Sequence, residues 1–260
     1  MAVDYRTEGD VAIITLARPE TFNAIDAALS AELVEALQRA GEASRAAVIT
    51  GQGKAFCSGA DLRDLLEDYE VGAPDLARLV EERFNPVARA VAGAQVPTVA
   101  ALNGAAAGAG MGLALACDLR VMAEDAYFTS AFINVALIPD TGSSWYLAHT
   151  VGLSRALEIA YSGRKVAAQE ALGLGMAHAV TPPEDLELEA ISQAGRLANG
   201  PTGAYVATRL LLRGAATSNL DQALAEELRV QGELGARPSH VEGVKAFLEK
   251  RSPDFRSMGS

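Results

Sequence analysis

Residues 97–112 read PTVAALNGAAAGAGMG, and the fold follows from this stretch. Residues 97–102 form a short continuous apolar run, which is typical of a strand buried on both faces of a parallel sheet. The pair Asn103-Gly104 breaks that pattern and predicts a turn. A helix-compatible segment over residues 108–116 follows, so the stretch predicts a strand, a tight junction and a helix.

The same alternation continues on both sides of this stretch. Three more apolar runs predict strands, at residues 11–16, 46–50 and 119–123. Asp26 is a good cap for a helix whose apolar residues recur about once a turn, namely Leu29, Leu33, Leu37 and Ala40. Strands that alternate with helices pair in parallel through crossover connections, so we expect an α/β fold.

After about residue 143, helical patterns dominate. They are separated by Gly and Pro breaks such as Gly200-Pro201, and they cover residues 155–161, 168–174, 186–198, 205–213, 220–235 and 241–250. The end of the chain is therefore expected to be helical.

The composition favours a folded protein with a large core and narrows its partners. The 260 residues are 50% hydrophobic, and 22 basic against 33 acidic residues give a net charge of −11. Such an acidic chain is a poor binder of nucleic acid and of anionic membranes, and an anionic ligand would need a locally positive pocket. No apolar stretch resembles a membrane span and no signal-peptide pattern opens the sequence, so we expect no nucleic-acid or membrane partner and a cytoplasmic location.

Cysteine and histidine offer little chemistry. Cys57 and Cys117 cannot make a disulfide framework, and no Cys/His cluster has the spacing of a metal site, so we expect no metal. Cys57 could be a nucleophile, but a small buried residue is the favoured interpretation. The three histidines lack the spacing of a nucleophile–base pair and are expected to be structural or surface groups.

A second glycine-containing junction lies at residues 56–62, FCSGADL, after the strand predicted at residues 46–50. Small residues let another molecule approach the backbone, and the N–H groups of a helix's first turn have no acceptor within the helix. Two such junctions side by side would aim free amides at one point, as a developing oxyanion requires. For either junction taken alone, tight packing of helix on strand is the simpler explanation.

Asp140 follows an apolar run, in VALIPDTG at residues 135–142. Partial removal from water would raise the pKa of its carboxyl group and make it a usable proton acceptor. An Asp shortly before residues 143–147 is equally a good helix N-cap, so both roles stay open. For Asp61, a cap or a first-turn charge is the favoured interpretation.

These motifs, taken together and in order, resemble the crotonase (enoyl-CoA hydratase/isomerase) superfamily. The likeness rests on ARPETFNA at residues 17–24, KAFCSGADL at 54–62, PTVAALNG at 97–104, ACDLR at 116–120 and EGVKAFLEKRSP at 242–253. Residues 131–142, AFINVALIPDTG, look most like the branch that includes the phenylacetate-pathway ring-epoxide isomerase.

The resemblance implies a fold and a ligand. The fold would be a ββα spiral catalytic core over residues 1–200, followed by a helical region over residues 201–260 that mediates oligomerisation and covers the active site. The ligand would be an acyl-CoA thioester, with coenzyme A as part of the substrate and no separate cofactor. Assembly as a homotrimer or a dimer of trimers is also implied.

The resemblance also implies catalytic roles. The backbone N–H groups of Ala60 and Ala109 would hold the thioester oxygen and stabilise an enolate. Relatives that hydrate enoyl-CoAs carry two glutamates where this chain has Gly112 and Phe132, neither of which can move a proton. Asp140 matches the base of the isomerase branch and of some Δ3,Δ2-enoyl-CoA isomerases, where one carboxylate carries a proton from one carbon to another.

Further substrate contacts are expected from the same likeness. The segment that carries Ala60 would line the substrate site with Ala55, Cys57, Gly59 and Asp61. Two aromatic residues would line the acyl pocket, Phe132 and Trp145.

Two basic residues are expected near the nucleotide end of the coenzyme. Arg18 lies where relatives contact it, and Lys250 would reach it from a neighbouring subunit. Glu20 stands where many relatives have a basic residue, which argues against tight phosphate contacts at that point.

We therefore expect an acyl-CoA isomerase that moves a double bond, or a bond derived from a ring epoxide, by enolate chemistry. Two other functions stay open: an enoyl-CoA hydratase with an unconventional acid/base, and a non-catalytic acyl-CoA-binding protein. Displacement by Asp140 as a nucleophile, as in dehalogenase-like relatives, is disfavoured because Phe132 stands where that branch has Trp.

Overall fold

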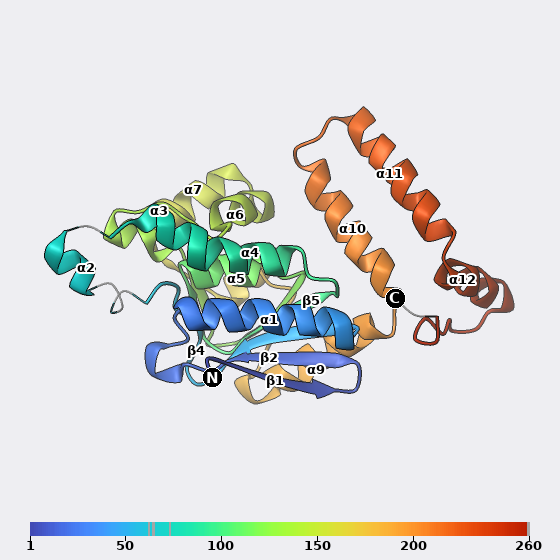
Figure 1. Ribbon diagram of the computed structural model, residues 1–260, viewed down its shortest axis with the longest axis horizontal. Helices are drawn as coiled ribbons and strands as arrows, with labels where there is room; N and C mark the ends of the chain where they lie inside the picture. The colour runs from blue at the N-terminus through green and yellow to red at the C-terminus, as the bar shows by residue number, and fades with distance from the viewer. Residues whose placement is uncertain (62, 64–65, 73, 259–260) are drawn as a thin grey trace.

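A six-stranded sheet forms the centre of the computed structural model, which describes residues 1–61, 63, 66–72 and 74–258 (Figure 1). Its strands lie in the order β1 (Val3–Glu8), β2 (Val11–Leu16), β3 (Ala46–Gly51), β5 (Thr98–Leu102), β7 (Leu119–Ala123) and β10 (Ala179–Thr181). β1 and β2 form an antiparallel hairpin, and all other neighbours pair in parallel. The predicted strands and the α/β class are confirmed.

A second sheet is built from strands of only three residues each. Their order is β4 (Ala55–Cys57), β6 (Ala105–Ala107), β8 (Tyr127–Thr129) and β9 (Lys165–Ala167). Along the chain, each of β3, β5 and β7 is followed by a strand of this second sheet and then by helical structure. The recurring ββα unit confirms the expected spiral core. The second sheet itself was not predicted, because three residues are too few to show a period.

Helices cover the first sheet. Helix α1 (Ala27–Ala43) packs against β1, β2 and β3, and α9 (Leu186–Ala198) packs against β2, β3, β5 and β7. α1 begins where the sequence predicts, because the Asp26 carboxylate accepts a hydrogen bond from the Leu29 N–H at 2.7 Å. Its predicted apolar stripe is buried.

The other helical segments of the core connect the ββα units. They are η1 (Pro19–Thr21), α2 (Leu66–Val71), α3 (Leu76–Leu79), η3 (Val80–Phe84), α4 (Asn85–Ala92), α5 (Ala109–Ala116), η4 (Ala131–Val135), α6 (Ser143–Val151), α7 (Leu153–Ser162), α8 (Ala168–Gly173) and η5 (Pro183–Asp185). α5 is buried along its whole length, as expected of a helix that is apolar all round. The N-terminus of α5 is therefore presented inside the molecule.

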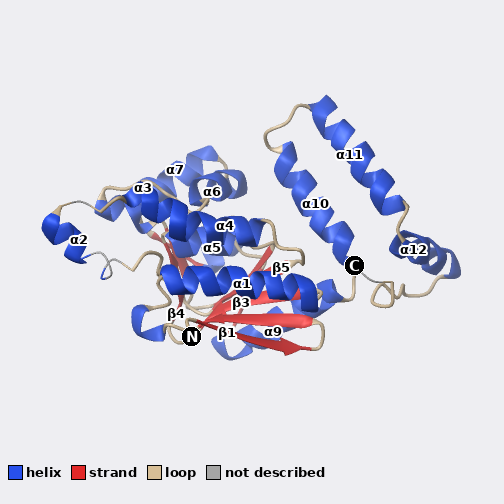
Figure 2. Ribbon diagram, viewed as in Figure 1, coloured by secondary structure: helices blue, strands red, loops and turns tan. Residues whose placement is uncertain are grey.

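The C-terminal region consists of α10 (Thr202–Ala215), α11 (Leu220–Gly235) and α12 (Pro238–Glu249). These helices stand to one side of the core, on the right in Figure 1, and Figure 2 shows that the strands gather in the core instead. The helical end of the chain is thus confirmed. The prediction missed β9 and β10, which lie among the helices after residue 143.

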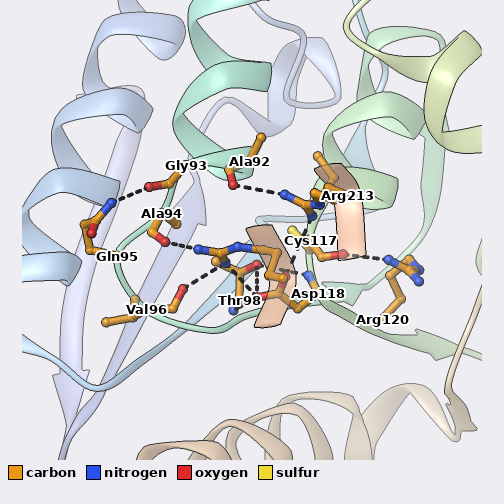
Figure 3. Close-up of polar contacts among 12 residues, drawn as sticks. Ala92, Gly93, Ala94, Gln95, Val96, Thr98, Cys117, Asp118, Arg120 and Arg213 are labelled. Atoms are coloured by element: carbon orange, nitrogen blue, oxygen red, sulfur yellow. Dashed lines mark hydrogen bonds and ion pairs between the residues drawn. The ribbon is translucent and has the colours of Figure 1, made fainter. Parts of the chain in front are cut away.

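Arginine side chains attach α10 to the core (Figure 3). Asp118, two residues after α5 ends, accepts hydrogen bonds from Arg209 Nη1 at 2.8 Å and from the Thr98 N–H at 2.9 Å. Arg213 donates to the carbonyl groups that end α4 and α5, at 2.9 and 2.7 Å. Cations at helix C-termini satisfy carbonyls that have no partner within the helix, so these contacts fix the base of the C-terminal region.

Candidate active site

The two glycine-containing junctions meet in the structure. β4 pairs in parallel with β6, and Ala55 lies opposite Ala105. Gly59 has a φ of +90°, and a Cβ on it would lie 2.8 Å from the Ala107 oxygen and 3.1 Å from the Ala109 nitrogen. Both the left-handed backbone and the lack of space therefore require glycine. The loop after β4 touches the first residue of α5.

Ala60 and Ala109 each bring a backbone N–H to this contact. Ala109 is the first residue of α5, so its N–H has no acceptor within the helix. In the described parts of the chain, neither N–H donates to a protein acceptor. The N-terminus of α5 adds partial positive charge. Two N–H donors at one place suit an oxygen atom that gains negative charge during a reaction.

The loop at residues 18–26 packs against the end of β4. The Ile25 N–H donates to the Gly59 oxygen at 2.7 Å, and Asn23 Nδ2 donates to the Ala55 oxygen at 2.7 Å. Asn23 is fully buried and adopts a left-handed backbone with a φ of +57°. Sequence reasoning quoted Asn23 within a motif but gave it no role. Nothing in the local sequence distinguishes Asn23 from the other polar residues of the motif at residues 17–24.

Ala55 and Cys57 are buried within β4. Burial raises the pKa of the Cys57 thiol to about 12, so the thiol stays protonated at neutral pH and is a poor nucleophile. The interpretation of Cys57 as a small buried residue is confirmed. A contact of either residue with substrate stays a prediction.

Asp140 lies between η4 and α6 and is partly buried. Its carboxylate accepts a hydrogen bond from Thr141 Oγ1 at 2.8 Å. Removal from water raises the pKa of this carboxyl group above its usual range, as a proton acceptor requires, and the bond from Thr141 opposes the shift. The N-cap of α6 is Gly142, with no side-chain hydrogen bond, so the interpretation of Asp140 as a helix cap is wrong.

The residues after Asp140 pack on α5. A Cβ on Gly112 would lie 2.7 Å from the Thr141 oxygen and 2.5 Å from Ser143 Oγ. Gly112 stands three residues after Ala109, so about one helical turn separates them. The residues directly after Asp140 therefore pack on α5 about one turn from Ala109. Neither Thr141 nor Ser143 was singled out from the sequence, because their role depends on a contact between distant segments.

Phe132 and Trp145 lie on the two sides of Asp140 along the chain. Phe132, in η4, is buried, and its ring tip lies 3.8 Å from where a Cβ on Gly108 would stand. It therefore borders the glycine turn that begins α5. Trp145, in α6, makes an edge contact with Tyr146 at 4.9 Å between ring centroids and is partly exposed. Both positions are compatible with a pocket wall, and the acyl contact stays a prediction.

Arg18 and Asp61 pair with each other, whereas Lys250 lies elsewhere. Arg18 Nη2 is 3.3 Å from Asp61 Oδ2, and Arg18 Nη1 is 3.1 Å from Asp26 Oδ2. Lys250 is exposed at the end of α12, on the C-terminal region that stands apart from the core in Figure 1. Within one chain, Arg18 contacts Asp61 and Gly59 lies against Ala109, whereas Lys250 lies on the C-terminal region. A common substrate site for the predicted residues stays a prediction.

The described residues hold no group of three or more His, Cys, Asp or Glu side chains that could bind a metal ion. No described helix combines the length and apolar character needed to cross a bilayer. A groove of about 770 Å³ lies between α10 and α11, and another of about 660 Å³ lies where α11 and α12 meet. Neither groove includes a residue of the Ala60–Ala109–Asp140 arrangement.

Residues 6–258 match the family described as enoyl-CoA hydratase/isomerase. A relative from Rhodobacter capsulatus, described as a probable enoyl-CoA hydratase, is 41% identical over 97% of both chains. The 1,2-epoxyphenylacetyl-CoA isomerase of Escherichia coli K12 is 38% identical over 95% of both chains. A crystal structure of an enoyl-CoA hydratase from Bacillus anthracis has a TM-score of 0.91 at 30% identity and covers 100% of both chains.

The fold, with two junctions that meet at the buried N-terminus of α5, defines an enzyme of the crotonase class. The chain belongs to the enoyl-CoA hydratase/isomerase family. The resemblance stated from the motifs is confirmed, and an acyl-CoA thioester as substrate accords with the family.

Proposed function

We propose that the protein is an acyl-CoA isomerase in which Asp140 is the only proton carrier. The observation that carries the proposal is the partly buried Asp140, whose carboxyl group has a raised pKa. Gly112 and Phe132 stand at the two positions where hydratases carry their glutamates, and neither can move a proton. The R. capsulatus and E. coli relatives carry hydratase and isomerase names at similar identity, so their names do not decide between the two reactions.

The reaction begins with the thioester oxygen between the N–H groups of Ala60 and Ala109. Asp140 removes a proton from the α- or γ-carbon of the acyl chain, and the electron pair moves onto the thioester oxygen. The enolate then collapses as the protonated Asp140 returns the proton to the other carbon. The double bond has moved, and no atom has been gained or lost. Each backbone donor contributes about 2.7–4 kcal/mol of transition-state stabilisation if it behaves as measured donors do.

A hydratase is the second candidate, and the relative from R. capsulatus supports it. Hydration needs one group to activate water and a proton source for carbon. Asp140 could supply one of these, whereas Gly112 and Phe132 supply neither. We therefore rank isomerisation first.

Proton NMR in deuterated water separates the candidates. Wild-type protein is incubated with a 3-enoyl-CoA, with crotonyl-CoA and with saturated butyryl-CoA. We expect double-bond migration with deuterium incorporation for the first, and no hydration of the second. Asp140→Asn is expected to abolish migration, while Asp125→Asn, at an exposed position, serves as the matched control. Hydration of crotonyl-CoA that survives Asp140→Asn would support the hydratase.

We also propose that residues 201–260 mediate assembly into homotrimers or dimers of trimers and cover an active site. Exposed apolar side chains support this, among them Leu212, Leu228, Phe247 and Leu248 on α10 to α12. Large exposed apolar surface commonly marks an interface. In such an assembly Lys250 would approach the coenzyme of a neighbour. Sedimentation velocity should give three or six times the mass of one chain, and a single-chain mass at micromolar concentration would contradict the proposal.

We propose that the protein is located in the cytoplasm. The two free, buried cysteines, Cys57 and Cys117, accord with a reducing compartment. Fractionation of cells with an antibody to the chain tests this.

A further inference from the structure

We propose that Arg18 is a positioning residue that fixes the direction of the Ala60 N–H through Asp61. The inference rests on the proposed function, because the direction of this N–H matters only if it holds a thioester oxygen. In this proposal Arg18 acts through Asp61 and does not contact the substrate.

The Gly59–Ala60 peptide unit sets the direction of the donor. No peptide bond in the described chain is cis, and in a trans unit the C=O and the N–H point in opposite directions. The Gly59 oxygen accepts from the Ile25 N–H at 2.7 Å. Hence the Ala60 N–H points away from the 18–26 loop. The hydrogen bond between Ile25 and Gly59 therefore helps to fix the direction of the Ala60 N–H.

Arg18 bridges the residues on both sides of that bond. On the loop side, Nη1 donates to the Ala24 oxygen at 2.8 Å and lies 3.1 Å from Asp26 Oδ2. On the donor side, Nη2 lies 3.3 Å from Asp61 Oδ2. Ala24 and Asp26 flank Ile25, and Asp61 follows Ala60. A guanidinium group is a rigid planar fork, so it holds the two backbone segments at one separation.

Burial makes this bridge effective. The side chains of Arg18 and Asp61 are only 16% and 7% exposed, so water screens their attraction less than it screens a surface pair. Asp61 Oδ1 also accepts the Arg63 N–H at 3.2 Å, which holds the carboxylate from its other oxygen. Asp26 is held by its role as the cap of α1. Arg18 thus ties the donor loop to the start of a core helix.

The same contacts argue against the nucleotide role expected for Arg18 from the sequence. One guanidinium with two carboxylates within 3.3 Å has a combined charge of −1, from +1 and −2. Such a cluster repels a phosphate more than it attracts one. The two roles make opposite predictions, which allows a sharp test.

Kinetics and coenzyme binding provide the first test. We expect Asp61→Asn and Arg18→Gln to lower kcat for the 3-enoyl-CoA by about 10- to 100-fold, because misplacing one oxyanion donor costs a large part of its effect. Arg18→Lys, which keeps the charge without the fork, should recover part of kcat. The Kd for free coenzyme A should change less than about twofold. The matched control is Asp125→Asn, which removes an exposed carboxylate outside this bridge and should leave kcat near wild type.

The carbonyl of bound butyryl-CoA provides a direct readout of the donor. This saturated thioester cannot isomerise, and hydrogen bonds to its oxygen lower the C=O stretching frequency. Isotope-edited infrared spectra should show the lowered frequency in wild type and in Asp125→Asn. In Asp61→Asn and Arg18→Gln the frequency should move back toward its value in water. A merely structural role for the pair would leave the frequency of the folded variant unchanged.

Amide exchange of Ile25, followed by NMR without ligand, completes the test. Loss of the bridge should speed this exchange in Asp61→Asn and in Arg18→Lys, but not in Asp125→Asn. An unchanged kcat and carbonyl frequency in folded Asp61→Asn overturns the inference, as does a raised Kd for coenzyme A with unchanged kcat in Arg18→Gln. If wild type moves no double bond, the proposed function fails, and the carbonyl frequency and Ile25 exchange still decide the role of Arg18.

Discussion

Gly112 and Ser143 touch so closely that a Cβ on Gly112 would lie 2.5 Å from Ser143 Oγ. The position where hydratases of the family carry a glutamate is therefore occupied here by the turn that follows Asp140. A second acid could not be added without moving that turn. Packing as well as residue identity therefore excludes a second acid at position 112.

This contact predicts that Gly112→Ala destabilises the protein by about 1–3 kcal/mol, the usual range for overpacking a core. Gly112→Glu should destabilise it at least as much and should not create hydratase activity. Gly195→Ala is the matched control, because a Cβ there meets nothing within 4 Å and alanine favours a helix by about 0.5–1 kcal/mol. Urea unfolding measures all three variants. A Gly112→Glu protein that hydrates crotonyl-CoA would contradict the prediction, because the turn after Asp140 would then have moved to admit the glutamate.

Asp140→Asn should be more stable than wild type at neutral pH, in addition to losing activity. Burial raises the folded-state pKa of Asp140, so the charged form is disfavoured by folding. The unfolded state releases this proton at lower pH than the folded state, and stability falls as pH rises through the two values. The gain from Asn should therefore be present at pH 7 and vanish below about pH 4, near the pKa of an unperturbed Asp. Thermal unfolding from pH 3.5 to 7 checks this, and a gain that does not depend on pH would exclude desolvation of Asp140 as its cause.

Asp118→Asn should loosen α10. Arg209 is only 6% exposed and pairs with Asp118, so the change leaves a buried guanidinium without its counter-charge. Loss of one partner of a buried pair costs about 3–5 kcal/mol, and we expect the lower end because the Asp118 side chain is 21% exposed. Glu158→Gln, in a pair with Arg164 on the surface, should cost far less, because water screens this exposed pair. Hydrogen exchange should locate the loss at residues 202–215, and equal costs for the two variants would refute the role of Asp118.

His178 predicts a loss of stability in acid. Partial burial, with the Arg120 guanidinium nearby, lowers its folded-state pKa from 6.5 to about 4. Because the folded state disfavours the charged ring, the stability that depends on the neutral ring is complete above pH 6.5 and is lost as pH falls toward 4. In wild type, the Arg120 N–H donates to His178 Nδ1 at 3.1 Å. His178→Asn offers an acceptor for this N–H but has no group that titrates in this pH range. Its Tm should fall less between pH 7 and 4.5 than that of wild type or of His240→Asn.

The long strands and helices could be predicted from the sequence, because each has a clear local pattern of apolar residues. Strand β5 is buried at every position and apolar after Thr98, and α1 has both its cap and its apolar stripe. The second sheet escaped prediction because its three-residue strands are defined by their partners. The pairing of β4 with β6 joins two segments about 50 residues apart, and nothing local announces it.

The candidate site divides in the same way. Ala60, Ala109 and Asp140 came from motif likeness, and the structure brings their segments together through contacts at Gly59 and Gly112. The local sequence around Asp140 did not distinguish a helix cap from a buried acid, since only the position of Gly142 at the start of α6 settles it. Arg18 was expected to face a ligand. Its pairing with Asp61 and Asp26 depends on loop geometry that spacing along the chain does not encode.

The donors at Ala60 and Ala109 belong to the main chain, so among the natural side chains only proline would delete them. In the proposed mechanism, the backbone N–H groups bind the thioester and the Asp140 side chain moves the proton, so the two tasks fall to different groups. An Asp140→Asn protein should consequently act as a molecular trap, which retains an acyl thioester it can no longer turn over. Such a trap, loaded from a cell extract and read by mass spectrometry, would reveal the natural acyl group.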